Sequence, residues 1–361
     1  MRKMTVTRSC ERRAMTKCMP AMVWSAAALM LSLLMGSMKS LAAEFPQTQI
    51  SNGPITAKIY LPDAKNGYYR STRFDWSGAV YSLQYKGHEF YGPWFDRIDP
   101  KVINWVHQGT EIVSGPCSAL EGPVDEFALP LGFDDAKVGG TFIKIGVGVL
   151  RKTEGKYNQY SPYEVLNPGK WTVKKRKDSV EFEQQLSDPA TGYGYVYRKV
   201  VRLTKGKPEM TIERSLRNTG KVEIKSSVYD HNFMVIDKQA PGPDFTFRVP
   251  FQISALRPPK KELVAVQGNE VVYQKQLSGQ DEGVVLMGGF GDSAQDSAIT
   301  IENKKVGAGV KIIGDRPLIR ELLWSVRTVL AVEPYVAIDV APGAEFNWSN
   351  TLEYYTTPEG K

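Results

Sequence analysis

The sequence predicts an all-β protein that folds as a large antiparallel β-sandwich with few, short helices. Apolar and polar residues alternate with a period of two in many segments, which is the pattern of a strand with one buried face. Gly, Pro, Asn and Asp interrupt these segments at intervals of roughly 8–12 residues, the spacing typical of sandwiches and barrels. No long stretch carries apolar residues at the i, i+3, i+4, i+7 spacing of an amphipathic helix.

The strands are predicted from the segments in which the alternation is clearest: Thr56–Leu61, Ala79–Tyr85, Ser179–Leu186, Tyr193–Val201, Met210–Leu216 and Val222–Tyr229. Between the last two lies the turn Arg217–Gly220, where Gly220 is expected to supply a positive φ. The basic run 170–177 is expected to be a solvated edge strand, because edge lysines discourage pairing with other chains. No linker or repeat divides the chain, so residues 44–361 are expected to form one domain.

Residues 1–43 have the three-part layout of a secretory signal. A basic leader precedes an apolar run from Ala21 to Met35, and small residues follow at Ser40–Ala43. The apolar run has about 15 residues, short of the ~20 that span a bilayer. Removal of this segment is therefore expected over its retention as a membrane anchor. The protein is expected to be exported to the periplasm or secreted, with no stable membrane insertion.

The same leader holds most of the net charge and two of the three cysteines. It contributes a net +6 of the chain's +7, so residues 44–361 carry about +1. That is too little to generate a field that attracts nucleic acid or an anionic membrane. Without Cys10 and Cys18, Cys117 is the one thiol left; it forms no internal disulfide and matches no zinc spacing. A buried or rim thiol is expected, a nucleophile is the alternative, and no metal site is predicted.

Two residues are candidates for proton transfer. His231 directly follows a predicted strand, where a rigid sheet can aim a side chain into a cleft, and histidine exchanges protons near neutral pH. The alternative is a buried histidine bonded to the backbone. Glu333 stands in the apolar run Val329–Tyr335, where burial would raise its pKa and make it a better base. The alternative is a strand-end glutamate that reaches solvent.

Several motifs, in the same order along the chain, resemble those of the aldose 1-epimerase (galactose mutarotase-like) family. Tyr229–Phe233 is similar to the family's "NHxYF" strand end and is preceded, as there, by an "xNTG" turn. Ala331–Pro334 is similar to the "LEPQ" segment. Ala341–Phe346, followed by Leu352–Tyr355, is similar to the closing "LxPGExY…YxF" strands. The resemblance runs from about Gly78 onward and implies the family's large β-sandwich.

The resemblance also implies an activity. It assigns His231 as general acid and Glu333 as general base in the interconversion of the α and β anomers of an aldose, with no cofactor or metal. An early arginine of the family binds the sugar, and here Arg73 and, less well, Arg70 are candidates. The family's early "HGG" histidine has no counterpart in this chain. His107 is a possible substitute, and Glu126 is a further candidate for substrate binding.

Aromatic side chains in turn-rich contexts could cover the apolar faces of a sugar, or could simply fill the core; they are Tyr91, Trp94, Trp105, Tyr157, Tyr160, Tyr163 and Trp171. The sequence leaves a second class of function open, a non-catalytic carbohydrate-binding or glycan-processing accessory protein on the same fold. A lyase or hydrolase is a weaker third possibility. The expected partner in each case is a sugar or oligosaccharide, and neither its identity nor the oligomeric state is predicted.

Overall fold

A computed structural model describes residues 45–357. The predicted signal segment, residues 1–43, lies outside the described residues, so its removal and the export of the protein stay predictions. From Phe45 to Thr357 the chain forms one compact unit. Among the helices of the described residues, none has the length and apolar character needed to cross a membrane.

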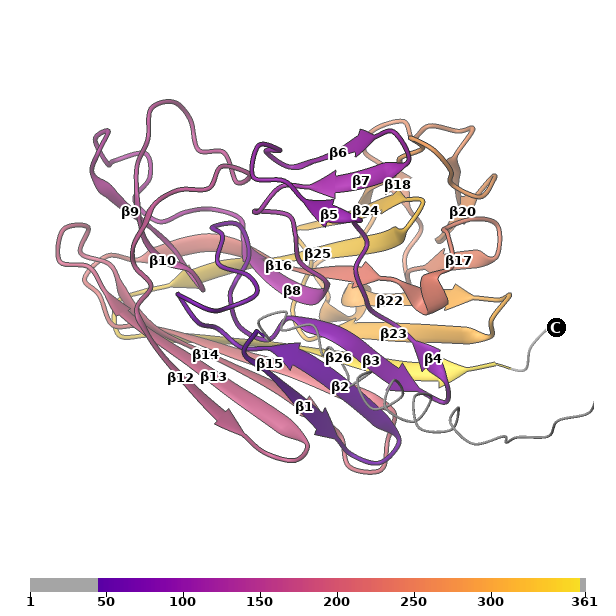
Figure 1. Ribbon diagram of the computed structural model, residues 1–361, viewed down its shortest axis with the longest axis horizontal. Helices are drawn as coiled ribbons and strands as arrows, with labels where there is room; N and C mark the ends of the chain where they lie inside the picture. Colours follow the sequence, from indigo (N-terminus) through magenta and orange to yellow (C-terminus); the bar gives the residue numbers. More distant parts are fainter. Residues whose placement is uncertain (1–44, 358–361) are drawn as a thin grey trace, which may run out of the picture. The chain divides into compact units, whose positions relative to one another are not determined.

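Five sheets build this unit (Figure 1). The ten-stranded sheet has, in spatial order, β12 (Lys170–Lys175), β13 (Ser179–Ser187), β14 (Gly194–Leu203), β15 (Glu209–Asn218), β26 (Glu345–Thr356), β23 (Ala308–Gly314), β22 (Ala298–Asn303), β17 (Phe245–Arg248), β20 (Glu270–Tyr273) and β19 (Val264–Gln267). The six-stranded sheet has β18 (Ser254–Ala255), β21 (Gly283–Gly288), β24 (Arg320–Val326), β25 (Val329–Val340), β16 (Ile224–Met234) and β8 (Gly122–Phe127).

The N-terminal part of the chain adds three smaller sheets. They contain β1 (Gln47–Ser51), β2 (Ile55–Tyr60), β3 (Val80–Tyr85) and β4 (His88–Glu89); β11 (Val165–Asn167), β10 (Gly148–Arg151) and β9 (Thr141–Lys144); and β5 (Arg97–Ile98), β7 (Glu111–Ser114) and β6 (Trp105–Gln108). The described residues contain two 3₁₀ turns, η1 (Ile236–Lys238) and η2 (Ala294–Ser297), and no longer helix. The prediction of an antiparallel β-sandwich with few short helices is therefore confirmed.

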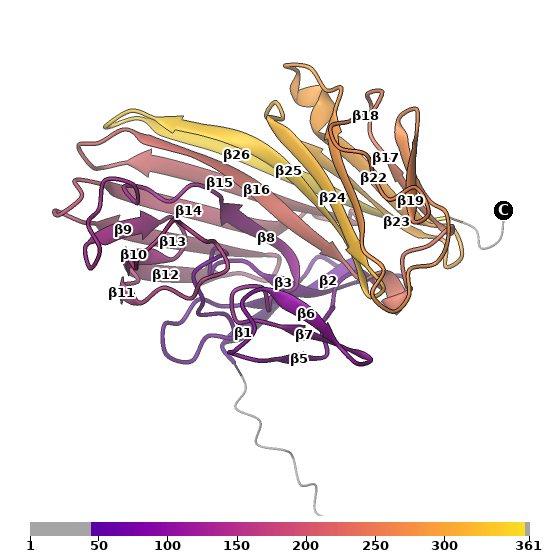
Figure 2. The same ribbon diagram turned by 90° about the horizontal axis from the view of Figure 1, so that it is seen from above.

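The two large sheets face each other across the core. Phe127, Val228 and Ile338 of the six-stranded sheet pack in one cluster with Tyr197 and Trp348 of the ten-stranded sheet. Side chains on a strand alternate between faces, so the residues between them along the same strands point away from this core. That second face of the six-stranded sheet carries the candidate site. Figure 2 shows its strands β24, β25 and β16 side by side.

Charged side chains also bridge the two sheets. Arg214 of β15 donates from Nε and Nη2 to the two carboxylate oxygens of Asp125 on β8, each at 2.7 Å. Lys199 of β14 lies 2.8 Å from Asp125 and 2.6 Å from Asp75. Asp230 on β16 lies 3.2 Å from Arg214. These five residues, the inter-sheet charge cluster, are all buried, and each charge depends on its partners because water does not solvate it.

The predicted strands are found, with two local corrections. The run 170–177 contains β12, the edge of the ten-stranded sheet, as predicted. Gly220 does not have a positive φ; glycine is needed there because a Cβ would lie 2.4 Å from the backbone nitrogen of Gly194. His231 does not follow a strand but lies inside β16, since this strand continues to Met234. Its final seven residues are all buried, so the polar alternation that marks its beginning ends before the strand does.

Candidate active site

Strand pairing places His231 beside Glu333. The antiparallel register of β16 and β25 pairs Tyr229 with Tyr335 and Phe233 with Ala331, so His231 comes level with Glu333 on the same face. The next strand, β24, pairs its Leu322 with Glu333. One row across the sheet thus carries an imidazole, a carboxylate and an aliphatic side chain. The next row on one side carries two tyrosines and an arginine, and the next row on the other side carries phenylalanine, alanine and tryptophan.

The two candidate proton-transfer groups are in contact and nearly buried. Nε2 of His231 lies 3.2 Å from Oε1 of Glu333, with 4% and 7% of their side-chain surfaces exposed. Burial, and next the charge of Arg73, hold the pKa of His231 well below its usual 6.5. Burial raises the pKa of Glu333 to about 7, although Arg73 and the Tyr335 hydroxyl both act to lower it. Low dielectric thus disfavours the charged form of each group.

Aromatic neighbours fix the orientation of the pair. The ring of His231 stacks on Phe233, its neighbour along the same face, with centroids 3.8 Å apart. The rings of Phe74 and His231 meet in a T-shaped contact, with centroids 5.7 Å apart. The hydroxyl of Tyr335 donates to Oε2 of Glu333 at 2.8 Å, which leaves Oε1 directed at His231. Nδ1 of His231 is buried and has no hydrogen-bond partner among the described residues, whereas Nε2 faces Oε1 of Glu333.

Arg73 brings a positive charge to the pair from a loop that precedes β3. Its Nε donates to Oε2 of Glu126 at 2.7 Å, its Nη1 to Ser118 at 3.2 Å and its Nη2 to Tyr229 at 3.1 Å. Arginine has five N–H groups, and these three bonds use three of them, so two have no hydrogen-bond partner among the described residues. Because the guanidinium is held on three sides, it presents those N–H groups in a fixed direction.

A cavity of about 160 Å³ opens over this pair. Its size suits a ring-sized ligand, because an apolar cavity of about 150 Å³ holds benzene. It is lined by Arg73, Trp94, Asn104, Trp105, Ser118, Tyr160, His231, Phe233, Glu282, Leu322, Trp324 and Glu333. Its walls therefore combine flat aromatic surface with a few fixed polar groups, which is the usual composition of a small-molecule site.

Of the predicted site residues, the structure brings His231, Glu333 and Arg73 together at this cavity. It places Arg70 elsewhere: Arg70 is exposed, donates to the carbonyl of Lys65 at 2.6 Å and lines a different cavity. The position of Arg70 thus corrects the prediction that it contacts the same ligand.

Glu126 and His107 do not line the cavity either. Glu126 is fully buried beneath it, where Arg73, Lys144 and the Tyr229 hydroxyl occupy its oxygens. Glu126 therefore does not make the predicted contact with substrate; it binds Arg73, which does line the cavity. His107 lies behind Trp105, with Nδ1 3.0 Å from Nη1 of Arg327. Since arginine only donates, Nδ1 accepts, and burial followed by Arg327 lowers the pKa of His107.

Sequence reasoning missed half of the cavity wall. Of the aromatic candidates, Trp94, Trp105 and Tyr160 line it, but Phe233, Leu322 and Trp324 were not singled out. The signal for them was the period-two spacing from Arg320 through Leu322 to Trp324, and from His231 to Phe233, which places each set on one face. Which face that is depends on strand pairing, and no local pattern gives it.

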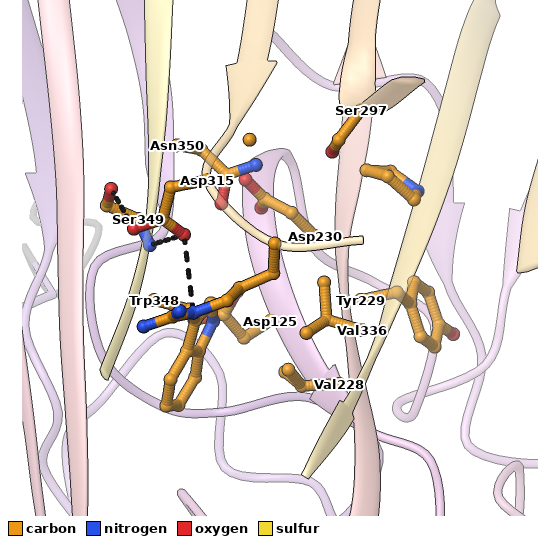
Figure 3. A pocket seen from close by; sticks show the side chains of 13 residues that line it. Asp125, Val228, Tyr229, Asp230, Ser297, Asp315, Val336, Trp348, Ser349 and Asn350 are labelled. Carbon is orange, nitrogen blue, oxygen red and sulfur yellow. Dashed lines mark hydrogen bonds and ion pairs between the residues drawn. The ribbon is translucent and has the colours of Figure 1, made fainter. Parts of the chain in front are cut away.

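Other features of the described residues carry less chemistry. Cys117 is buried and free, with its sulfur 2.8 Å from the hydroxyl of Ser71, and it does not line the cavity. Within residues 45–357, no group of three or more His, Cys, Asp and Glu side chains is arranged to hold a metal ion. A second pocket, shown in Figure 3, lies between the two large sheets beside Asp125 and Asp230. Its volume is about 10 Å³, room for no more than one water, so it is not a sugar-sized site.

Solved structures with the same fold share little sequence with this chain, and no family model and no curated protein matches it. The Slr1438 protein from Synechocystis sp. PCC 6803 is 12% identical, with a TM-score of 0.51 over 87% of this chain and 97% of its own. A candidate aldose 1-epimerase from Escherichia coli K12 is 11% identical, with a TM-score of 0.50 over 86% and 100%. A galactose mutarotase-like protein from Clostridium acetobutylicum is 12% identical, with a TM-score of 0.50 over 86% and 95%.

The described part of the chain therefore has the galactose mutarotase-like fold. At 11–12% identity to these structures, it is a divergent example of that fold, and its activity has to be argued from its own side chains.

Proposed function

We propose that this protein is an aldose 1-epimerase, which interconverts the α and β anomers of an aldose by opening and closing its ring. The observation that carries the proposal is the contact of His231 and Glu333, 3.2 Å apart, at a ring-sized cavity. The fold likeness agrees with this proposal.

The reaction moves one proton off the sugar and one proton onto it. A base removes the proton from the anomeric hydroxyl O1, the C1–O5 bond breaks with its electron pair going to O5, and an acid protonates O5. Rotation about C1–C2 then exposes the other face of the aldehyde, and the reverse steps close the ring. Because O1 and O5 share one carbon, the groups that serve them must be close neighbours. His231 and Glu333 meet that requirement.

One proton shared by the pair supplies both roles. When the pair holds a single exchangeable proton, one member is an acid and the other a base. The pKa shifts place that proton mainly on Glu333; its transfer to His231 gives the form in which Glu333 takes the proton from O1 and His231 donates to O5, as the family resemblance implies. Positioned acid and base groups of this kind contribute about 10²–10⁴-fold each. The free N–H groups of Arg73 and the aromatic walls of the cavity then hold and shield the ring.

The direct test is acceleration of mutarotation by the wild-type protein. Freshly dissolved α-glucose and α-galactose are followed by polarimetry, and the rate with protein is compared with the rate in buffer and with heat-denatured protein. We expect equilibration to become faster in proportion to the concentration of native protein for at least one aldose of such a panel. Equal rates with native and denatured protein for every aldose would falsify the enzymatic proposal.

The pH dependence of kcat/KM is expected to be bell-shaped, with its alkaline limb near pH 7. Above about pH 7 the pair loses its last proton, because that is the pKa of Glu333, and the rate should fall about tenfold per pH unit. The acid limb lies lower, where the depressed pKa of His231 is crossed. The charged and titratable groups nearest to Glu333 are Arg73, Tyr335, Glu126 and Arg320. A rate that rises with pH through 7 would contradict the shared-proton mechanism.

Tyr335→Phe tests the alkaline limb, because the Tyr335 hydroxyl lowers the pKa of Glu333. Its removal should move this limb to higher pH, whereas a purely structural role would lower kcat/KM without moving it. Tyr355→Phe is the matched control, since Tyr355 donates to Glu302, on a different strand from the pair, and should leave the profile unchanged.

One observation favours a binding protein without catalysis. Among the described residues, His231 is the only histidine that lines the cavity, so the hydroxyl-holding histidine of the family is not replaced there. This alternative predicts that sugars raise the melting temperature while anomer exchange stays at the buffer rate. Thermal melting and polarimetry on the same protein preparation separate the two functions.

A further inference from the structure

A second cavity adjoins the candidate active site along the same sheet face. It has a volume of about 340 Å³, and we call it the basic recess. It is lined by Arg257, Pro258, Pro259, Lys260, Glu282, Val284, Leu286, Arg320 and Leu322. Glu282 and Leu322 also line the cavity of His231 and Glu333, so the two spaces share a wall.

Strand register fixes the distance between the recess and the reacting groups. Leu322 of β24 pairs with Glu333 of β25 on one side and with Leu286 of β21 on the other. The row from Glu333 to Leu286 therefore crosses two strand spacings, about 10 Å. Figure 1 shows β18, which leads into the loop with Arg257 and Lys260, at the β24 end of this sheet. The recess is thus a separate space beyond Leu322 and not an extension of the cavity at His231 and Glu333.

The recess carries unneutralised positive charge. Arg257, Lys260 and Arg320 are all exposed, and no acidic side chain of the described residues lies within ion-pair distance of any of them. Glu282, the one acid in the lining, accepts a hydrogen bond from Nε1 of Trp324 at 2.8 Å. Arginine and lysine at the wall of a cavity attract and bind carboxylate, sulfate or phosphate groups.

Arg320 connects this charge to the reacting groups. Its guanidinium lies over the ring of Tyr335 at 4.8 Å, and Tyr335 in turn donates to Glu333. Apolar side chains from β21 and β24, Val284, Leu286 and Leu322, form the floor between the cations. An aliphatic floor with cations at its rim fits a ligand that has an apolar face and an anionic substituent.

We propose that the basic recess binds an anionic group on the sugar unit next to the reacting one, so that the ligand is an acidic oligosaccharide with a free reducing end. This inference rests on the proposed function, because that function places the reducing unit at Glu333. Leu322 stands between the two spaces, so the anionic group belongs to the second ring. The shared chemistry is a carboxylate, sulfate or phosphate that meets Arg257, Lys260 and Arg320.

Isothermal titration calorimetry with the full chain tests the recess by binding alone. The probes are a disaccharide of glucuronic acid linked to a reducing glucose, the neutral disaccharide cellobiose, and glucose 6-phosphate. We expect the acidic disaccharide to bind about tenfold more tightly than cellobiose, the effect of one charge-assisted hydrogen bond. This preference should shrink as salt is raised, because the cations are exposed.

Arg257→Ala/Lys260→Ala should remove the preference and leave the affinity for cellobiose unchanged. Lys261→Ala is the matched control, since Lys261 is an exposed neighbour that does not line the recess. Equal affinities for the two disaccharides in the wild type overturn the proposal. Glucose 6-phosphate binding more tightly than the acidic disaccharide, with the same dependence on Arg257 and Lys260, also overturns it, because the anion would then lie on the reacting ring.

The outcomes of calorimetry and polarimetry are independent. A wild type that prefers the acidic disaccharide but does not accelerate anomer exchange supports the recess and rejects the epimerase. A wild type that accelerates exchange but binds both disaccharides equally supports the epimerase and rejects the recess.

Discussion

Glu333→Gln is expected to lower kcat/KM for mutarotation by about 10²–10⁴-fold. The amide has the size of the carboxyl and can still accept from Tyr335 and contact His231, but it cannot take a proton from the anomeric hydroxyl. Because the cavity keeps its shape, sugar binding should persist while the rate falls. Polarimetry corrected for the buffer rate gives kcat/KM, and calorimetry gives the affinity of the same preparation.

His231→Gln should have an effect of similar size, and the double variant should be little slower than the slower single variant. Groups that act as one unit give strongly non-additive losses, because removal of one disables the other. Glu302→Gln is the matched control, since Glu302 lies on β22 of the ten-stranded sheet and should retain full activity. Additive losses, or a Glu333→Gln protein as fast as the wild type, would show that the pair does not transfer protons together.

Arg214→Met is expected to lower the free energy of unfolding by about 3–5 kcal/mol, the usual cost of leaving a buried charge without its partner. Arg214 donates to both oxygens of Asp125 and lies 3.2 Å from Asp230. Burial alone would raise the pKa of Asp125, but Arg214 and Lys199 outweigh it and hold this pKa below its usual value. Without Arg214, three buried carboxylates share Lys199. Urea unfolding with an unchanged m-value measures the loss.

Arg198→Met is the matched control, because Arg198 on the neighbouring strand is partly exposed and pairs with Glu181. Its loss should be below about 1 kcal/mol, as for other surface ion pairs. Equal effects of the two substitutions would mean that the inter-sheet charge cluster is solvated in the folded protein.

The cluster also positions residues of the candidate site, because Asp125 and Asp230 directly precede Glu126 and His231 on their strands. Arg214→Met should therefore also lower activity at temperatures below its unfolding transition.

Local patterns identified part of the strands and singled out two residues of the candidate site. Period-two alternation identified β2, β3, β13, β14 and β15 to within a few residues at their ends. In a strand with one solvent-exposed face, successive side chains point alternately to solvent and to the core, so neighbouring positions alone reveal the strand. The lysine run 170–177 identified an edge strand for the same local reason. His231 and Glu333 stood out through motifs. Their contact on one face nevertheless depends on the pairing of β16 with β25.

Tertiary structure alone decided what surrounds that pair. The sequence contains Arg70 and Arg73 three residues apart, and only the fold directs one of them to His231 and the other to a separate cavity. Leu322 and Trp324 read as ordinary strand residues until the register of β24 and β25 sets them beside Glu333. The basic recess likewise joins residues from a loop and two strands. The physical reason is that strand register and sheet packing depend on contacts between distant parts of the chain, and these leave no local periodicity.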